Sequence, residues 1–237
     1  MCTVTTVPHD DGFRLACNRD ERRDRPAATL PAVHRLQHNT AIYPVDPVGG
    51  GTWVGVNDAG LAATLLNRTL DSATPPGCAP PRSRGLIIPH LLGSRSLTDA
   101  LTLATGLDPA EFGLFRLVLA QRIVAVVLTS DGRALSVDAM SVSRPTMVTS
   151  SSLGDAVVEA PRRRLFERLV LNSHGACLTA QTRFQAHQWR SRAEISVAME
   201  RLDARTVSRT FISVTSNRIE LRYHPLGSAK PAVVRAA

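Results

Sequence analysis

Lysine is almost missing from this chain, since Lys230 is the only one and the other 27 of its 28 basic residues are arginines. Aromatic residues are also scarce, at 4% of 237 residues, and the arginines are spread from Arg14 to Arg235. A nucleic-acid-binding surface usually gathers its positive charge on one element, with aromatic side chains interleaved. The net charge of +8 therefore reflects the codon bias of a GC-rich, bacterial genome better than a contact with nucleic acid, and we expect no nucleic-acid partner.

The sequence also lacks an apolar run long enough to cross a membrane. The longest, residues 117–128, is interrupted by Gln121 and Arg122 and falls short of the roughly 20 residues that a transmembrane helix needs. The N-terminal segment reaches His9 before a signal-like apolar stretch can form. We therefore expect a protein without a membrane span that stays in the cytoplasm.

Several common site motifs are missing. The four cysteines form no C-x-x-C pair, which argues against a disulfide framework and a structural zinc site. His34 and His38 stand four apart in a proline-flanked segment, where two solvated loop histidines are a better interpretation than a metal pair. Glycine motifs for dinucleotides or phosphates, a nucleophile elbow and a metalloprotease helix motif are all missing. We therefore expect neither a metal nor a cofactor.

Alternating β-branched and polar residues predict two hairpins in the first third of the chain. The four strands are predicted over residues 3–7, 13–17, 52–56 and 61–66. The last of these is apolar on both faces, as expected for a central strand. Between the hairpins, residues 26–51 are rich in proline, so we expect an irregular loop that can line a site.

The rest of the chain alternates between blocks of helices and blocks of strands. Residues 71–84 hold four prolines and are predicted to be an exposed linker inside the domain. Apolar residues at spacings of three and four predict helices over residues 85–92, 97–105, 161–171 and 191–202. Further strands are predicted over residues 115–119, 123–128, 134–137, 147–151, 210–214 and 219–223. This order favours two sheets, or one large antiparallel sheet, covered by helices.

Position 2 has the most informative chemistry. Removal of Met1 would leave Cys2 with both a thiol and a free α-amine, and an amine that titrates near roughly 7.7 can accept the thiol proton directly or through a water. Nucleophile and base then share one residue, and no histidine is needed. From this position alone, a small buried residue that begins a strand is the simpler interpretation.

A second cluster, residues 17–21, ends the strand that is predicted to pair with the first one. With the turn near residues 10–11, residues 18–20 fall opposite residues 2–4. This pairing places Asp20 where its carboxylate can hold the α-amine and Arg19 where its guanidinium favours a thiolate. A solvated strand end with several charges is the alternative interpretation.

Together these residues resemble the NRDE family, also called the transport and Golgi organisation protein 2 family. The matching motifs are Met1-Cys2, NRDE at 18–21, GGTWVGVN at 50–57, LNR at 66–68 and, late in the chain, DART at 203–206. The resemblance implies an α+β fold, a four-layer αββα sandwich of antiparallel sheets, in one domain over residues 1–237. This is the N-terminal nucleophile hydrolase fold, whose members include the choloylglycine hydrolases and penicillin acylases. Animal members of the family are linked to Golgi organisation and, by proposal, to lipid or haem handling.

The resemblance also implies roles for the site residues. By similarity to choloylglycine hydrolases, Cys2 is the nucleophile, Asp20 holds its amine and Asn67 binds the oxyanion with a backbone N–H. Asn18 and Arg19 complete this catalytic set. Where those relatives carry a second asparagine, this chain offers only hydroxyls, in the stretch that contains Ser150.

Three further places have open interpretations. Trp53 and Arg68 are candidates for substrate binding, although a core anchor on a strand is the plainer interpretation of Trp53. The three arginines at 162–164 include a possible site residue, but a solvated helix face explains them better. Cys17 is interpreted as a buried residue of small volume.

Two hypotheses of function follow. The leading one is an amidohydrolase that cleaves a linear C–N amide bond through an acyl-thioester on Cys2, with a small acyl amide as its partner. The rival is a non-catalytic protein whose pocket binds or carries a hydrophobic ligand such as a lipid or haem.

Overall fold

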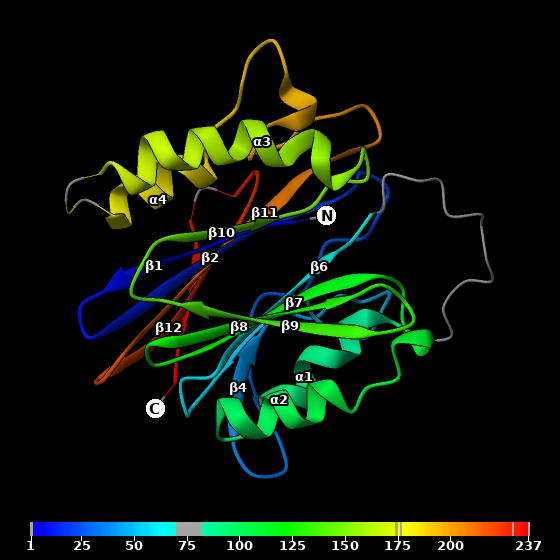
Figure 1. Ribbon diagram of the computed structural model, residues 1–237, viewed down its shortest axis with the longest axis vertical. Coiled ribbons are helices and arrows are strands. Elements are labelled where there is room, and N and C mark those ends of the chain that lie inside the picture. Colours follow the sequence, from blue (N-terminus) through cyan, green and yellow to red (C-terminus); the bar gives the residue numbers. More distant parts are fainter. Residues whose placement is uncertain (1, 70–81, 174, 176, 229, 237) are drawn as a thin grey trace.

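The computed structural model describes residues 2–69, 82–173, 175, 177–228 and 230–236. In these residues two antiparallel sheets stack face to face, and a pair of helices covers the outer face of each sheet (Figure 1). The predicted four-layer αββα sandwich is therefore confirmed. Most of the predicted linker at 71–84 lies outside the described residues. None of the helices described is long and apolar enough to cross a membrane.

The first sheet has six strands in the order β10-β1-β2-β11-β12-β13. Its strands are β1 (Cys2–His9), β2 (Gly12–Arg22), β10 (Thr146–Thr149), β11 (Ala204–Thr215), β12 (Arg218–Pro225) and β13 (Ala232–Arg235). The first predicted hairpin is present, but its register differs by one residue from the prediction. Because His9 pairs with Gly12 across a turn of only two residues, Cys2 lies opposite Arg19.

The second sheet has seven strands in sequential order, from β3 to β9. They are β3 (Ala32–Arg35), β4 (Thr40–Tyr43), β5 (Val54–Asn57), β6 (Ala62–Asn67), β7 (Phe115–Gln121), β8 (Val124–Ser130) and β9 (Leu135–Ser141). Strand β6 lies in the middle of the sheet, as its apolar sequence predicted. The prediction that residues 26–51 are irregular is wrong in part, because β3 and β4 pair there. The prolines of this stretch flank the two strands instead of interrupting them, so the ladder keeps its donors.

In the described part of the chain, four α-helices form the outer layers (Figure 1). They are α1 (Ile87–Leu92) and α2 (Leu97–Thr105) on the second sheet, and α3 (Asp155–Phe166) and α4 (Cys177–Gln185) on the first. Short helical segments are η1 (Arg84–Leu86), η2 (Pro109–Glu111), the π-helical η3 (Glu167–Leu171) and η4 (Ala193–Ile195). Helix α2 has the predicted bounds, since the Ser96 hydroxyl accepts the Asp99 N–H at its start and Gly106 ends it.

The helix predicted over residues 191–202 is wrong. Only η4 is helical there, and Ser196, which follows it, has extended backbone with φ of −63° and ψ of 160°. Beyond it the backbone bonds to a distant segment and does not continue a helical ladder, since the Ala198 N–H donates to the His187 carbonyl at 2.9 Å.

Two more helices differ from the prediction. Helix α3 begins six residues before Pro161, which lies inside it. Helix α4 was not predicted, because its inner face is polar. The buried amides of Gln181 and Gln185 both donate to the Thr5 hydroxyl at 2.9 Å, so this helix docks on β1 through hydrogen bonds as well as through apolar packing.

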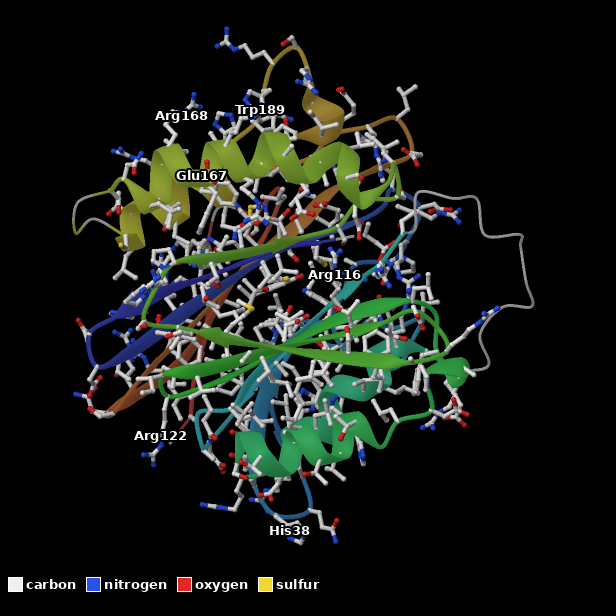
Figure 2. The ribbon with its side chains drawn as sticks, viewed as in Figure 1. His38, Arg116, Arg122, Glu167, Arg168 and Trp189 are labelled. Atoms are coloured by element: carbon white, nitrogen blue, oxygen red, sulfur yellow. The ribbon has the colours of Figure 1, made fainter. Side chains whose placement is uncertain are left out.

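The apolar core has three layers, one between the sheets and one under each helical pair. Arg116 of β7 bridges the sheets: it donates to the Thr149 carbonyl at 2.8 Å and pairs with Asp155 at 3.2 Å (Figure 2). This contact joins the second sheet to the end of β10 and to the start of α3. It therefore fixes how the edge of the first sheet sits over the second, close to the beginning of β1.

Candidate active site

Cys2 begins β1 and is only 4% exposed. Its backbone N–H donates to the Ser150 hydroxyl at 3.3 Å, and the Ser150 N–H donates back to the Cys2 carbonyl at 3.0 Å. The Cys17 thiol hydrogen-bonds to the Cys2 sulfur and lowers the pKa of Cys2, against the opposing effect of burial. The pKa of Cys17 rises for the same reason, so Cys2 is the more acidic of the two thiols. Cys17 therefore does more than fill space.

A cavity of about 350 Å³ opens beside Cys2. Five segments of the chain line it: the start of β1, the end of β2 with the residues just after it, the loop before β5, the end of β6, and the residues that lead into η1 and begin it. The lining residues are Cys2, Arg19, Asp20, Glu21, Arg25, Asp46, Gly49, Gly51, Thr52, Trp53, Leu65, Asn67, Arg82, Ser83, Arg84 and Gly85. Cys2, Asp20 and Asn67, which were singled out from the sequence, thus face one space.

Asp20 comes from β2 and is 2% exposed. Thr206, its ladder partner in β11, donates its hydroxyl hydrogen to the Asp20 carboxylate at 2.6 Å. Burial raises the pKa of Asp20, while the positive charge of Arg162 and the bond from Thr206 act in the opposite direction. The late DART motif therefore has a physical role, because its threonine orients the carboxylate of the early NRDE motif.

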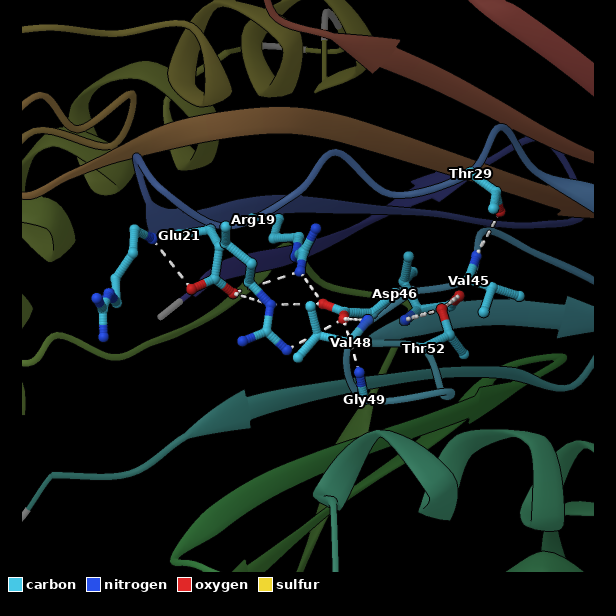
Figure 3. Close-up of polar contacts among 11 residues, drawn as sticks. Arg19, Glu21, Thr29, Val45, Asp46, Val48, Gly49 and Thr52 are labelled. Atoms are coloured by element: carbon cyan, nitrogen blue, oxygen red, sulfur yellow. Dashed lines mark hydrogen bonds and ion pairs between the residues drawn. The ribbon is translucent and has the colours of Figure 1, made fainter.

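Asp46 is the centre of an ion-pair network on one wall of the cavity (Figure 3). It accepts hydrogen bonds from Arg19, from the Arg25 Nε at 2.8 Å and from the backbone N–H groups of Val48 and Gly49 at 3.0 and 2.9 Å. Burial raises its pKa, but the bonds from Arg25 and Gly49 outweigh burial, so the pKa of Asp46 is lowered. The sequence prediction did not include Asp46. The signal that indicates it is an aspartate just before a glycine-rich turn, a common place for a carboxylate that caps loop N–H groups.

Arg19 joins this network to the aromatic wall. Its guanidinium lies 4.1 Å from the centre of the Trp53 ring and 3.3 Å from the Glu21 carboxylate, besides its bond to Asp46. Trp53 both lines the cavity and packs in the core between the sheets at 7% exposure, so the two interpretations of this residue hold together. The guanidinium of Arg19 is thus held beside Cys2 by Trp53, Glu21 and Asp46, and it is buried among these groups instead of being solvated.

The loop before β5 and the segment before α1 touch through their backbones. The Thr52 N–H donates to the Gly85 carbonyl at 2.9 Å, and a Cβ placed on Gly51 would lie 2.2 Å from the Gly85 carbonyl carbon. Only glycine fits at position 51, which explains part of the GGTW motif. This close approach fixes Arg84 at the cavity, where it donates to the Leu114 carbonyl at 2.7 Å.

Two predicted site residues lie elsewhere. The Asn18 amide donates to the carbonyls of Gln185 and Val197 at 2.8 and 2.9 Å, so it links β2 to the segments above it and does not line the cavity. Arg68 donates to the Ser130 carbonyl at 3.4 Å and does not line it either.

Arg162 is not part of a solvated helix face, so that interpretation is wrong for this residue. It is 1% exposed and donates to the hydroxyls of Thr3 and Thr149 at 2.9 and 2.6 Å and to two backbone carbonyls. Its neighbour Arg163 is exposed and pairs with Glu159, as expected. Arg162 ties β1 to β10 directly behind Cys2, and its charge also acts on Asp20. Hydrophobic periodicity could not separate the two arginines, because both belong to one polar run.

The groups that meet at the cavity are of the kinds that acyl transfer uses. A thiol with a lowered pKa, a buried carboxylate and a partly exposed amide at the end of β6 share one cavity. Among the described residues, no three His, Cys, Asp or Glu side chains gather as a metal site.

Comparisons with solved structures give the same fold at low sequence identity. Penicillin V acylase from Agrobacterium tumefaciens superposes with a TM-score of 0.61 at 12% identity, covering 99% of this chain and 86% of that one. The N-acylethanolamine-hydrolyzing acid amidase orthologue of Caenorhabditis elegans gives a TM-score of 0.61 at 13% identity, covering 89% of this chain and 92% of that one. A variant of conjugated bile acid hydrolase from Clostridium perfringens gives a TM-score of 0.57 at 11% identity, covering 99% of this chain and 92% of that one. These are proteins of the N-terminal nucleophile hydrolase fold.

A comparison with curated proteins finds no match. The family model described as Transport and Golgi organisation 2 matches residues 1–217, which include every motif discussed above. The chain therefore belongs to this family, the NRDE family.

Proposed function

We propose that this protein is a cysteine amidohydrolase that cleaves a linear amide through an acyl-thioester on Cys2. The observation that carries the proposal is the meeting of Cys2, Asp20 and Asn67 at one cavity, with the pKa of the Cys2 thiol lowered. The solved structures of similar fold support it, since they are titled as an acylase, an amidase and a hydrolase.

The first half of the reaction forms the thioester. After removal of Met1, the Cys2 sulfur attacks the amide carbonyl carbon while its α-amine takes the thiol proton. The carbonyl electrons move to the oxygen, which the Asn67 amide binds as an oxyanion. When the oxyanion collapses, the C–N bond breaks, and the ammonium of Cys2 gives its proton to the leaving nitrogen.

The second half releases the acid. A water attacks the thioester carbonyl and passes one proton to the α-amine of Cys2. The tetrahedral intermediate then collapses, which breaks the C–S bond and releases the acid. The ammonium of Cys2 returns its proton to the sulfur. Asp20 and the Ser150 hydroxyl hold the amine during both halves, in line with the 3.3 Å hydrogen bond between the Cys2 nitrogen and Ser150.

The charge of the cavity favours this proposal over the rival carrier of lipid or haem. Seven of the lining side chains carry a formal charge: Arg19, Asp20, Glu21, Arg25, Asp46, Arg82 and Arg84. Burying an apolar ligand against so many charges would remove their hydration without replacing it.

The test combines labelling with turnover. Intact-mass analysis after brief treatment with iodoacetamide is expected to show Cys2 modified before Cys17, Cys78 and Cys177, and N-terminal sequencing is expected to begin at Cys2. A panel of acyl amides is then compared between the protein and Cys2→Ser. Retention of Met1 on most molecules, or labelling of Cys2 no faster than the other cysteines, would remove the mechanism.

A further inference from the structure

The charges that line the cavity are almost all paired. Arg19 and Arg25 share the carboxylates of Asp46 and Glu21, with Arg25 at 2.8 and 3.5 Å. Arg82 pairs with Glu111 at 2.9 Å. In each of these pairs the carboxylate neutralises the arginine. The paired side chains therefore shape the wall of the cavity but leave no net charge that would attract a charged ligand.

Arg84 is different. Its one hydrogen bond in the described part of the chain goes to a neutral acceptor, the Leu114 carbonyl, and no described carboxylate lies within ion-pair distance of it. Burial lowers the pKa of Arg84, and the negative charges of Cys2 and Glu21 oppose that effect from a distance. A guanidinium stays protonated in proteins, so Arg84 brings a desolvated and uncompensated positive charge to the cavity that holds the nucleophile.

The position of Arg84 is fixed. It lies in η1, directly before Gly85, whose carbonyl accepts the Thr52 N–H and whose backbone touches Gly51. The bond to Leu114 uses only the Nη1 nitrogen, which leaves the other donors of a planar fork for a ligand. Carboxylates match this fork in geometry and charge.

We propose that Arg84 binds a carboxylate of the substrate, so that the amide cleaved at this site carries a carboxylate close to its scissile bond. The inference rests on the proposed function, because it takes Cys2 as the nucleophile. A cavity of about 350 Å³ suits an amide of this kind in size. An amide without a carboxylate has no negative group to replace the water that the Arg84 guanidinium loses on burial.

Two small alkylating reagents test this without knowledge of the substrate. Iodoacetate and iodoacetamide both form an S–C bond to a thiolate and release iodide, and they differ only in that the first carries a carboxylate where the second carries a neutral amide. Their rates at Cys2 are measured by mass spectrometry, and each is divided by its rate with glutathione. The variants are Arg84→Gln and, as a control with the same change of charge away from the cavity, Arg163→Gln, whose side chain is 48% exposed and already paired with Glu159.

The expected result is a preference of Cys2 for iodoacetate, which falls about fivefold or more in Arg84→Gln and stays unchanged in Arg163→Gln. Thermal melting of each variant verifies that it is folded. If Arg84 acts only by stabilising the thiolate, both reagents slow equally in Arg84→Gln, which would overturn the inference. Fast reaction of Cys2 with no preference would also overturn it while leaving the proposed function intact. If neither reagent selects Cys2, the proposed function fails as well.

Discussion

Cys2 and Ser150 are joined by two hydrogen bonds that run in opposite directions, although 148 positions separate them in the chain. One uses the serine hydroxyl as acceptor and the other uses its backbone N–H as donor. The backbone bond continues the ladder between β1 and β10, so it belongs to the fold. The hydroxyl bond reaches the nitrogen that becomes the α-amine once Met1 is removed, so it belongs to the proposed reaction.

Ser150→Ala is therefore expected to weaken the reaction at Cys2 with little effect on the fold. Loss of one hydrogen bond of about 1 kcal/mol corresponds to about a fivefold slower alkylation of Cys2 near neutral pH. Ser150→Thr, which keeps the hydroxyl, is the matched control and is expected to retain the rate. The measurement is the pH profile of iodoacetamide labelling, and an unchanged profile in Ser150→Ala would contradict the role of this hydroxyl.

Asp46→Asn is expected to cost stability in a pH-dependent way. The folded-state pKa of Asp46 lies below its ordinary value of 3.8, so its contribution is fully present above that value and is lost as pH falls through the lower, folded-state pKa. At pH 7 the substitution removes one partner of a mostly buried pair and is expected to lower the free energy of unfolding by about 3 kcal/mol.

Urea unfolding of both proteins from pH 7 to below pH 3 measures this difference. The gap between wild type and Asp46→Asn is expected to close only in the acid part of the range. A gap that does not depend on pH would mean that the asparagine disturbs packing and that the ion pairs with Arg19 and Arg25 contribute nothing.

The sequence predicted those features that depend on local pattern. Period-two alternation located the hairpin that places Cys2 beside Arg19, and capping residues gave the bounds of α2. Features that depend on distant partners were not accessible in this way. The burial of Arg162 arises from acceptors contributed by β1, β10 and the segment at 195–196. The polar inner face of α4 is explained by hydrogen bonds to Thr5, Arg14 and Ala16 of the first two strands.

The same limit explains the errors at the site. A motif names residues that are close in sequence, but alternate residues of a strand point to opposite sides. Asn18 therefore lies on the opposite side of β2 from Arg19 and Glu21 of the same motif, and its amide binds the carbonyls of Gln185 and Val197. Asp46, which no motif included, organises the wall of the cavity because the fold brings two arginines to it.

Arg162→Met is expected to be among the most destabilising single changes near the site. It would leave four acceptors in the protein interior without their donor, at about 3 to 5 kcal/mol in total. Arg163→Met, one position later and exposed, is the matched control and is expected to change stability by about 0.5 kcal/mol or less. Denaturant unfolding compares the two. Equal effects would show that Arg162 is not held as the structure describes.

Gly51→Ala tests the contact between the two loops that hold Arg84 at the cavity. The added Cβ would lie 2.2 and 2.3 Å from the Gly85 carbonyl carbon and oxygen, so the backbones must separate and the bond from the Thr52 N–H is strained or lost. We expect a loss of about 2 kcal/mol or more in the free energy of unfolding, measured with urea. We also expect a smaller preference of Cys2 for iodoacetate, because Arg84 moves with Gly85.

Gly50→Ala is the control. It distinguishes the effect of a steric contact with Gly85 from the effect of backbone strain at a neighbouring glycine. Gly50 has a φ of +66° and no atom within 4 Å of an added Cβ, so alanine there meets only backbone strain of about 1 kcal/mol. Its labelling preference is expected to match that of wild type. If Gly50→Ala and Gly51→Ala behaved alike in both measurements, the close approach of Gly51 to Gly85 would have no part in positioning Arg84.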